Sequence, residues 1–459
     1  MLGLALIFFL CYLSLCFNNN IWTDEAFTIE LLHSDFAGIL KGTASDVHPP
    51  LYYLIAKCVT LVFGDSLLCL KLVSILPMFL CMSWGALIVR KRFGFRAAVL
   101  YPVLLGVIPC TMEYAVQVRM YSWAIFFITF MALWAYEAYL EQSLRFYAGI
   151  VLTSAAAAYT HYFAFVSAIL IYGFLFLALL AGKRRELLKW LAAVAASLLL
   201  FAPWMPYMEL QVKGVSRNYW IEEITGETIK AFFPFLFDMS IPGTTALWMG
   251  LLAVSLFFAV RMMLSARRGQ KEEAGAGLFA LLCLLVPVGT ALTGITASAL
   301  IRPVFIVRYL LPCMGLAALF LAITLSRYAD GMVYGAMIFF FLCAGLVDYK
   351  QSVYREYEWT HTAETEAFLD SHVGERDIIA YNYESYKFIY DYYWSDEEKV
   401  LWQEMDLDNA EYDNIWLLDT IYWPTPTDEY LAEHGFRKTF MGNYGIEHND
   451  FKIFQITRL

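Results

Sequence analysis

Long apolar stretches alternate with short polar segments along the first three quarters of the chain. Apolar runs of about 17–25 residues are long enough to cross the hydrocarbon core of a bilayer as helices. By this criterion the pattern predicts about eleven transmembrane helices, near residues 2–17, 67–89, 97–112, 118–138, 147–160, 162–181, 190–206, 244–264, 277–297, 308–325 and 332–347. Thr160-His161-Tyr162 interrupts the long apolar run 146–182, which predicts a helical hairpin that turns there.

The segment between the first two predicted spans, residues 18–66, is unusually long for a loop. Residues 24–41 predict one amphipathic helix, because Phe27, Leu31 and Ile39 recur at helical spacing. After Pro49-Pro50, the apolar segment 51–63 is too short to span the bilayer comfortably. We therefore expect it to form an interfacial or re-entrant helix.

The last part of the chain, residues 348–459, has the alternating pattern of a small α/β domain. Strands are predicted at 377–381, 399–402, 414–418 and 451–456, and helices at 361–372, 384–394 and 427–434. This part contains no glycine-rich phosphate loop, so the sequence gives no support for nucleotide binding.

Composition sharpens this division into two parts. Hydrophobic residues make up 60% of the 459 positions and charged residues 16%, whereas a soluble protein has about a quarter of its residues charged. Residues 348–459 hold 24 acidic and 9 basic residues, and residues 1–347 hold 18 acidic and 23 basic residues. We predict a membrane domain, 1–347, and an acidic soluble domain, 348–459, which excludes a nucleic-acid partner.

Basic residues between the predicted spans set the orientation. Arg90-Lys91-Arg92, Lys183-Arg184-Arg185 and Arg267-Arg268 fall in loops on one side of the predicted topology. Because cytoplasmic loops of membrane proteins are enriched in Lys and Arg, these loops are predicted to be cytoplasmic. The loop 18–66 and the C-terminal domain are then extracytoplasmic, in a multi-pass protein of the cell membrane.

Asp24 and Glu25 follow the first predicted span within a few residues. Adjacent carboxylates point in different directions on a helix, so one of them could act as a general base while the other bonds backbone or substrate. The alternative is an acidic first turn that favours the helix dipole.

Asp46-Val47-His48-Pro49-Pro50 is a more specific string. The prolines stiffen the turn and could hold the carboxylate and the imidazole at one mouth. The alternative is a turn leading into the membrane that polar groups cap.

Several polar residues lie at the predicted outer ends of other spans: Glu113, Arg119, Tyr121, Arg302 and Arg308. Arginine is costly in apolar surroundings unless it pairs or binds an anion, and its guanidinium group fits phosphate oxygens. A lipid phosphate is therefore the candidate ligand. The alternatives are a Glu113–Arg119 ion pair, or arginines that extend to the headgroups.

His161 lies alone between two apolar helices, where a histidine is more often part of a polar turn than a ligand. Glu113 and His161 could contribute to a divalent metal site, but no spacing motif joins them. No cofactor is therefore certain from the sequence, and we assign no metal ligand.

These strings in order resemble the bacterial polyprenyl-phosphate-dependent glycosyltransferases of the GT-C superfamily, close to the protein O-mannosyltransferase and lipid A aminoarabinose transferase families. The resemblance rests on Ile21-Trp22-Thr23-Asp24-Glu25, Asp46-Val47-His48-Pro49-Pro50, Val118-Arg119-Met120-Tyr121, Thr160-His161-Tyr162 and Val307-Arg308-Tyr309-Leu310. It covers nearly all of residues 1–347.

The resemblance implies a GT-C fold and transfer of a sugar from a polyprenyl-phosphate donor to an extracytoplasmic glycan, lipid or protein, with inversion at the anomeric carbon. It implies that Asp24 is the general base and Glu25 its companion. Asp46, His48, Glu113, Arg119, Tyr121, His161, Arg302 and Arg308 are the candidate substrate-binding residues. Leu51-Tyr52-Tyr53 departs from the Gly-Lys that continues the protein O-mannosyltransferase string, which weighs against a protein acceptor.

Two other classes compete with this interpretation. A transporter keeps ionisable groups near the bilayer midplane in repeated halves, whereas here they gather at one face and the halves are dissimilar. A non-catalytic membrane scaffold that presents the C-terminal domain is the second alternative.

Overall fold

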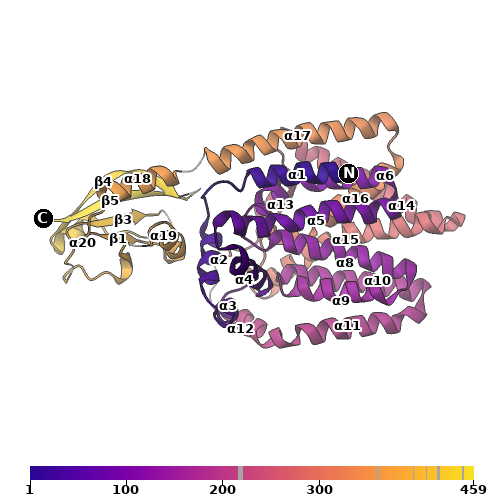
Figure 1. Ribbon diagram of the computed structural model, residues 1–459, viewed down its shortest axis with the longest axis horizontal. Coiled ribbons are helices and arrows are strands. Elements are labelled where there is room, and N and C mark those ends of the chain that lie inside the picture. The colour runs from indigo at the N-terminus through magenta and orange to yellow at the C-terminus, as the bar shows by residue number, and fades with distance from the viewer. Residues whose placement is uncertain (216–220, 359–360, 396, 410, 421–423, 447–448) are drawn as a thin grey trace. The chain divides into compact units, whose positions relative to one another are not determined.

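The computed structural model describes the whole chain except residues 216–220, 359–360, 396, 410, 421–423 and 447–448. The chain forms two compact units (Figure 1). The first comprises Met1–Phe17 and Ser34–Ser352, and the second comprises Asn18–His33 and Val353–Leu459. The segment that carries Asp24 and Glu25 therefore folds with the C-terminal part of the chain.

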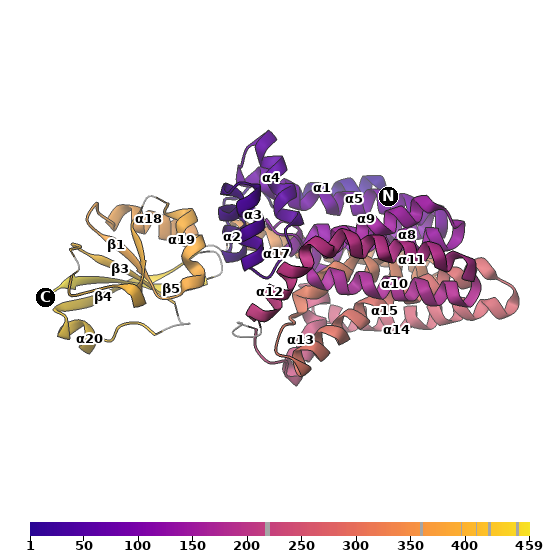
Figure 2. The same ribbon diagram turned by 90° about the horizontal axis from the view of Figure 1, so that it is seen from below.

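Apolar helices run side by side in the first unit (Figures 1 and 2). They are α1 (Leu2–Ser14), α5 (Leu67–Phe93), α6 (Phe95–Val107), α8 (Tyr121–Glu141), α9 (Leu144–Ala158), α10 (Tyr162–Gly182), α11 (Leu187–Phe201), α14 (Thr244–Leu264), α15 (Lys271–Leu300), α16 (Met314–Tyr328) and α17 (Gly331–Tyr357). Within the described residues, eight spans are long and apolar enough to cross a membrane, or nine if a bent pair counts as one. The predicted polytopic helical fold is confirmed; α1 and α9 are apolar but have only 13 and 15 residues.

The predicted span 97–112 is wrong as a single helix. It is broken at Ile108 into α6 and α7 (Pro109–Ala115), whose axes differ by 67°. Proline disfavours the helical conformation of the preceding residue, and Ile108 is accordingly extended.

The single amphipathic helix expected over 24–41 is also wrong, because two helices occupy this segment. The first, α2 (Thr23–His33), belongs to the second unit, and α3 (Phe36–Ser45) belongs to the first. The Asp35 carboxylate accepts a hydrogen bond from the Gly38 N–H at 2.7 Å. Asp35 therefore caps a new helix where the hydrophobic spacing alone suggested continuity.

One end of the helical bundle carries short helices instead of tight turns. They are α3, α4 (Leu51–Phe63), α12 (Met205–Val215) and α13 (Gly226–Phe237) (Figure 2). The 13 residues of α4 extend over about 20 Å, less than the roughly 30 Å of a bilayer core. The helix predicted at 51–63 is confirmed, with the expected short length.

The basic turns meet at the opposite end of the bundle. The Arg92 guanidinium bonds both Glu137 and Glu141, which joins the last turns of α5 and α8. Lys183 bonds the carbonyl oxygen of Tyr139, and Arg96 donates to the carbonyl oxygen of Ala329 at 2.7 Å. Because Arg92 and Lys183 both bond the last turn of α8, two of the three loops with predicted cytoplasmic charges lie at one end of the bundle.

The second unit contains a five-stranded sheet in the order β2-β1-β3-β5-β4. Its strands are β1 (Ile378–Tyr381), β2 (Lys399–Leu401), β3 (Ile415–Asp419), β4 (Phe436–Ile446) and β5 (Asn449–Arg458). β1 pairs in parallel with β2 and β3, whereas β5 is antiparallel to β3 and β4. Its helices are α18 (Thr362–His372), α19 (Lys387–Tyr393) and α20 (Asp428–Glu433). The predicted α/β domain is confirmed, but the sequence analysis missed β4.

Candidate functional site

Asp46 and His48 lie in the turn between α3 and α4. The Asp46 Oδ2 and His48 Nδ1 atoms are 2.9 Å apart, and the side chains are 27% and 13% exposed. Burial alone would raise the pKa of Asp46, but the positive charges of His48 and Arg119 lower it. Asp46 is therefore a carboxylate that orients the imidazole of His48. The turn therefore brings the two side chains into direct contact.

His161 lies at the start of α10, where it caps the helix. Its Nδ1 accepts a hydrogen bond from the Phe163 N–H at 3.1 Å, and the side chain is 2% exposed. Burial, together with the charges of His48, Arg119 and Arg308, keeps the pKa of His161 well below its ordinary value. The ring is therefore neutral, and because Nδ1 accepts, the proton is on Nε2.

Aromatic rings connect His161 to its surroundings. Its ring centroid is 6.1 Å from that of His48, 6.0 Å from that of Tyr121 and 5.1 Å from that of Tyr309. Tyr309 follows Arg308 directly in the sequence, and it is not among the residues that the sequence predicts for the site. The predicted residues His48, Tyr121 and His161 therefore come together, although 113 positions separate the first from the last.

Arg119 precedes α8 and is 2% exposed. Its Nη1 donates to the Tyr53 hydroxyl at 3.4 Å. An arginine buried within the protein does not extend to the headgroups, so that alternative is wrong for Arg119. Arg119 and Arg308 both lie within electrostatic range of the His161 imidazole, where their charges add to the effect of burial in lowering its pKa.

A cavity of about 360 Å³ opens beside these residues, within the size range of small-molecule sites. Its polar lining includes His48, His161, Gln211 and Arg302, and its apolar lining includes Val47, Phe163, Phe165, Val166, Met208 and Tyr309. A lining that combines a few polar groups with many apolar side chains suits a ligand that has a charged head and a lipid chain.

Besides Tyr309, the sequence motifs do not single out Gln211, which also belongs to this region. Gln211 of α12 lines the cavity, donates from Nε2 to the Thr43 carbonyl oxygen at 2.7 Å and bonds the Tyr162 hydroxyl. Lys71 in the first turns of α5 is 2% exposed. Lys71 is not among the residues that line the cavity.

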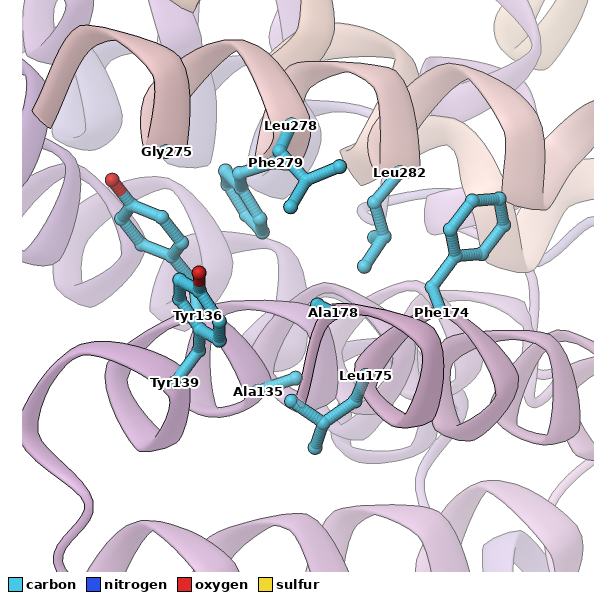
Figure 3. Close-up of a pocket in the computed structure, with 10 residues that line it drawn as sticks. All are labelled: Ala135, Tyr136, Tyr139, Phe174, Leu175, Ala178, Gly275, Leu278, Phe279 and Leu282. Carbon is cyan, nitrogen blue, oxygen red and sulfur yellow. The ribbon is translucent and has the colours of Figure 1, made fainter. Parts of the chain in front are cut away.

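A second pocket, lined by α8, α10 and α15, has a different character (Figure 3). Its volume is about 40 Å³, and its lining contains no charged side chain. Tyr136 and Tyr139 supply its hydroxyl groups (Figure 3). It lacks groups for acid–base or phosphate chemistry, so the cavity at His48 and His161 is the candidate site.

The remaining predicted residues have distinct positions. Glu113 lies half-buried in α7, and Arg308 lies half-buried in the 3₁₀ helix Val307–Cys313. Among the described residues, no three His, Cys, Asp or Glu side chains converge as metal ligands.

Asp24 and Glu25 occupy the first turn of α2 in the second unit. Glu25 is buried, and its Oε2 accepts a hydrogen bond from the Trp22 N–H at 3.1 Å. This is the reach-back contact of a helix-capping carboxylate. Asp24 is half-buried. The two acids therefore differ in their surroundings: Glu25 is buried and stabilises the first turn of α2, whereas Asp24 is partly exposed on that turn.

The fold is similar to that of solved membrane glycosyltransferases of GT-C architecture, and the expected resemblance is confirmed at that level. The family model of the dolichyl-phosphate-mannose-protein mannosyltransferases matches residues 47–207. No relative was found among curated protein sequences.

Among solved structures, ArnT from Cupriavidus metallidurans in the apo state is similar over 99% of this chain and 96% of that chain, with a TM-score of 0.59 and 13% identity. The same protein bound to undecaprenyl phosphate has a TM-score of 0.58 and 11% identity, with the same coverage. The oligosaccharyltransferase of Archaeoglobus fulgidus matches 90% of this chain and 68% of that chain, with a TM-score of 0.52 and 15% identity. At these identities the likeness defines the fold, and the chain is a multi-pass membrane protein of GT-C architecture.

Proposed function

We propose that this protein transfers a sugar from a polyprenyl-phosphate donor to an extracytoplasmic acceptor with inversion. The observation that carries the proposal is the cavity lined by His48, His161 and Arg302, with the charges of Arg119 and Arg308 close to His161. A neutral substrate would not need this concentration of cationic groups, whereas a phosphate would. The similar structure that holds undecaprenyl phosphate adds support.

In the proposed reaction, the acceptor hydroxyl attacks the anomeric carbon of the donor sugar. A new carbon–oxygen bond forms while the bond to the phosphate oxygen breaks, and the polyprenyl phosphate leaves with the electron pair. Asp24 takes the hydroxyl proton, an assignment that rests on its place in the sequence motif. Arg119, Arg308 and Arg302 stabilise the charge on the leaving phosphate.

The neutral Nε2–H of His161 is suited to donate a hydrogen bond to a phosphate or sugar oxygen. His48 is oriented by Asp46 at the same cavity. A glycan or lipid acceptor agrees with Leu51-Tyr52-Tyr53, where the protein O-mannosyltransferase string differs. Basic loops gathered at the opposite end of the bundle favour an extracytoplasmic position for the cavity.

Turnover in membranes with a panel of polyprenyl-phosphate sugars tests the proposal. We expect Asp24→Asn to lower sugar transfer by about 10²–10⁴-fold, the usual contribution of a general base. Glu30→Gln is the matched control, because Glu30 lies in the same helix and is 56% exposed. Undiminished transfer by Asp24→Asn would remove Asp24 as the base, and no transfer from any such donor by the wild type would remove the proposed reaction.

A further inference from the structure

The helix that carries Asp24 packs on an aromatic face of the C-terminal domain. Helix α19 buries Ile389 and Tyr390 in that domain. Phe388 and Tyr392, four residues apart, lie on another face of the helix. The Phe388 ring meets Phe27 of α2 edge to face, with the centroids 5.3 Å apart. This edge-to-face contact packs α2 against α19.

The hydroxyl of Tyr393 fixes the backbone that leads into α2. It accepts a hydrogen bond from the Ile21 N–H at 3.1 Å and donates to the Asn19 carbonyl oxygen at 3.3 Å. Both partners lie within five residues of Asp24. One side chain therefore satisfies a backbone donor and a backbone acceptor immediately before the first turn of α2.

Two further contacts restrain the same segment. The Asn20 Nδ2 donates to the Glu356 carbonyl oxygen at 2.7 Å, and the Asn18 Nδ2 donates to the Glu356 carboxylate at 3.3 Å. On the other side of Asp24, the buried Glu25 accepts from the Trp22 N–H. The backbone is thus fixed both before and after Asp24.

We propose that Tyr393 and Phe388 of the C-terminal domain are positioning residues that set the place of Asp24 for proton transfer. This inference rests on the proposed function, since it gives Asp24 the role of base. It assigns the C-terminal domain a part in turnover, because that domain supplies the surface on which the first turn of α2 is built. A displacement of about 1 Å of a catalytic group can cost two orders of magnitude in rate.

Tyr393→Phe removes the hydroxyl and keeps the ring, so it tests the contact with minimal change to packing. We expect its kcat to fall about tenfold while KM for the lipid donor changes less than twofold, since donor binding does not need the base. Tyr412→Phe is the matched control. Tyr412 donates to Glu398 at 2.8 Å on the exposed surface of the same domain, and its removal should leave kcat unchanged.

A double-mutant cycle with Asp24→Glu distinguishes positioning from general destabilisation. If Tyr393 acts through Asp24, the double variant loses less than the product of the two single losses, whereas the Tyr412 pair is multiplicative. Phe388→Leu tests the packing contact by the same cycle, with the amount of folded protein measured by size-exclusion chromatography.

Each outcome decides between the two proposals. Wild-type kcat in both Tyr393→Phe and Phe388→Leu, with Asp24→Asn inactive, overturns the positioning role and leaves the base assignment intact. Multiplicative losses with Asp24→Glu overturn it as well, because they indicate a purely structural contribution. Full turnover by Asp24→Asn instead refutes the proposed base itself, whatever the Tyr393 variant does.

Discussion

The two ends of the helical bundle differ in the groups that neighbour their positively charged side chains. At the end where α5 and α8 finish, the Arg92 guanidinium bonds the carboxylates of Glu137 and Glu141, and Glu141 also bonds Arg145. At the other end, the electrostatic neighbours that lower the pKa of His161 are His48, Arg119 and Arg308. Acids of the protein itself balance the first set of cations. The second set includes His48, which pairs with Asp46, but it adjoins a cavity, lined in part by His48, that an anionic ligand can enter.

This difference separates a structural use of charge from a functional one. A buried ion pair with both partners present holds two helices together, and its loss costs stability. Cations beside a cavity are within reach of an anionic ligand, so they mark positions where binding or catalysis can use them. The comparison predicts that equivalent substitutions lower stability at the first end and sugar transfer at the second.

Arginine substitutions give the largest expected contrast. We expect Arg119→Gln to lower kcat/KM for the lipid donor by about 10²–10³-fold, because a preorganised donor to the leaving phosphate is lost. Arg92→Gln should lower thermal stability but leave turnover per folded molecule unchanged. Donor-dependent transfer kinetics on both purified variants measure this contrast. Equal activity of the two variants would mean that the charges at the cavity do not serve catalysis.

Glu137→Gln tests the structural end directly. Glu137 is 2% exposed and pairs with Arg92, and removal of one partner of a buried pair costs about 3 kcal/mol. The free energy of unfolding in detergent should therefore fall by about that amount, without a change in donor KM.

The control for this change is Glu209→Gln. It makes the same substitution in an exposed pair with Lys213, where the expected loss is below about 1 kcal/mol. Similar losses in the two variants would refute the structural role of the Arg92 cluster.

Local patterns were sufficient to place most elements of the fold. The helix predicted at 361–372 is α18, and the hairpin predicted at Thr160-His161-Tyr162 turns there. Periodicity failed where one side chain decided the local conformation, as Asp35 does between α2 and α3. It also missed β4, whose pairing with β5 is irregular between Phe440 and Gly442.

The candidate site was predictable in its chemistry but not in its geometry. Asp46 and His48 are two residues apart on a stiff turn, so their contact followed from the sequence. The approach of His161 to Tyr309 joins residues 148 positions apart. Spacing carries no information about such a contact, because tertiary packing of helices creates it. The role of α19 in holding α2 was hidden for the same reason.

The titration of His161 depends on the charges around the cavity. Its effect on the free energy of unfolding is the smallest of the effects predicted here. The pKa of His161 lies well below 6.5 in the folded protein because of burial and the neighbouring cations. Above pH 6.5 the imidazole is neutral in both states and contributes no pH dependence. Below pH 6.5 the unfolded chain takes up a proton that the folded protein does not, so stability falls as the pH is lowered.

His161→Asn removes this titration and retains a good helix-capping side chain for α10. The unfolding free energy of the wild type should drop by about 1 kcal/mol more than that of His161→Asn between pH 7.5 and 5.5. His33→Asn, at a side chain that is 60% exposed, is the control. Added undecaprenyl phosphate should reduce the difference, because a bound anion offsets the cations around His161. An identical pH dependence in the wild type and His161→Asn would contradict the cationic cavity on which the comparison of the two ends depends.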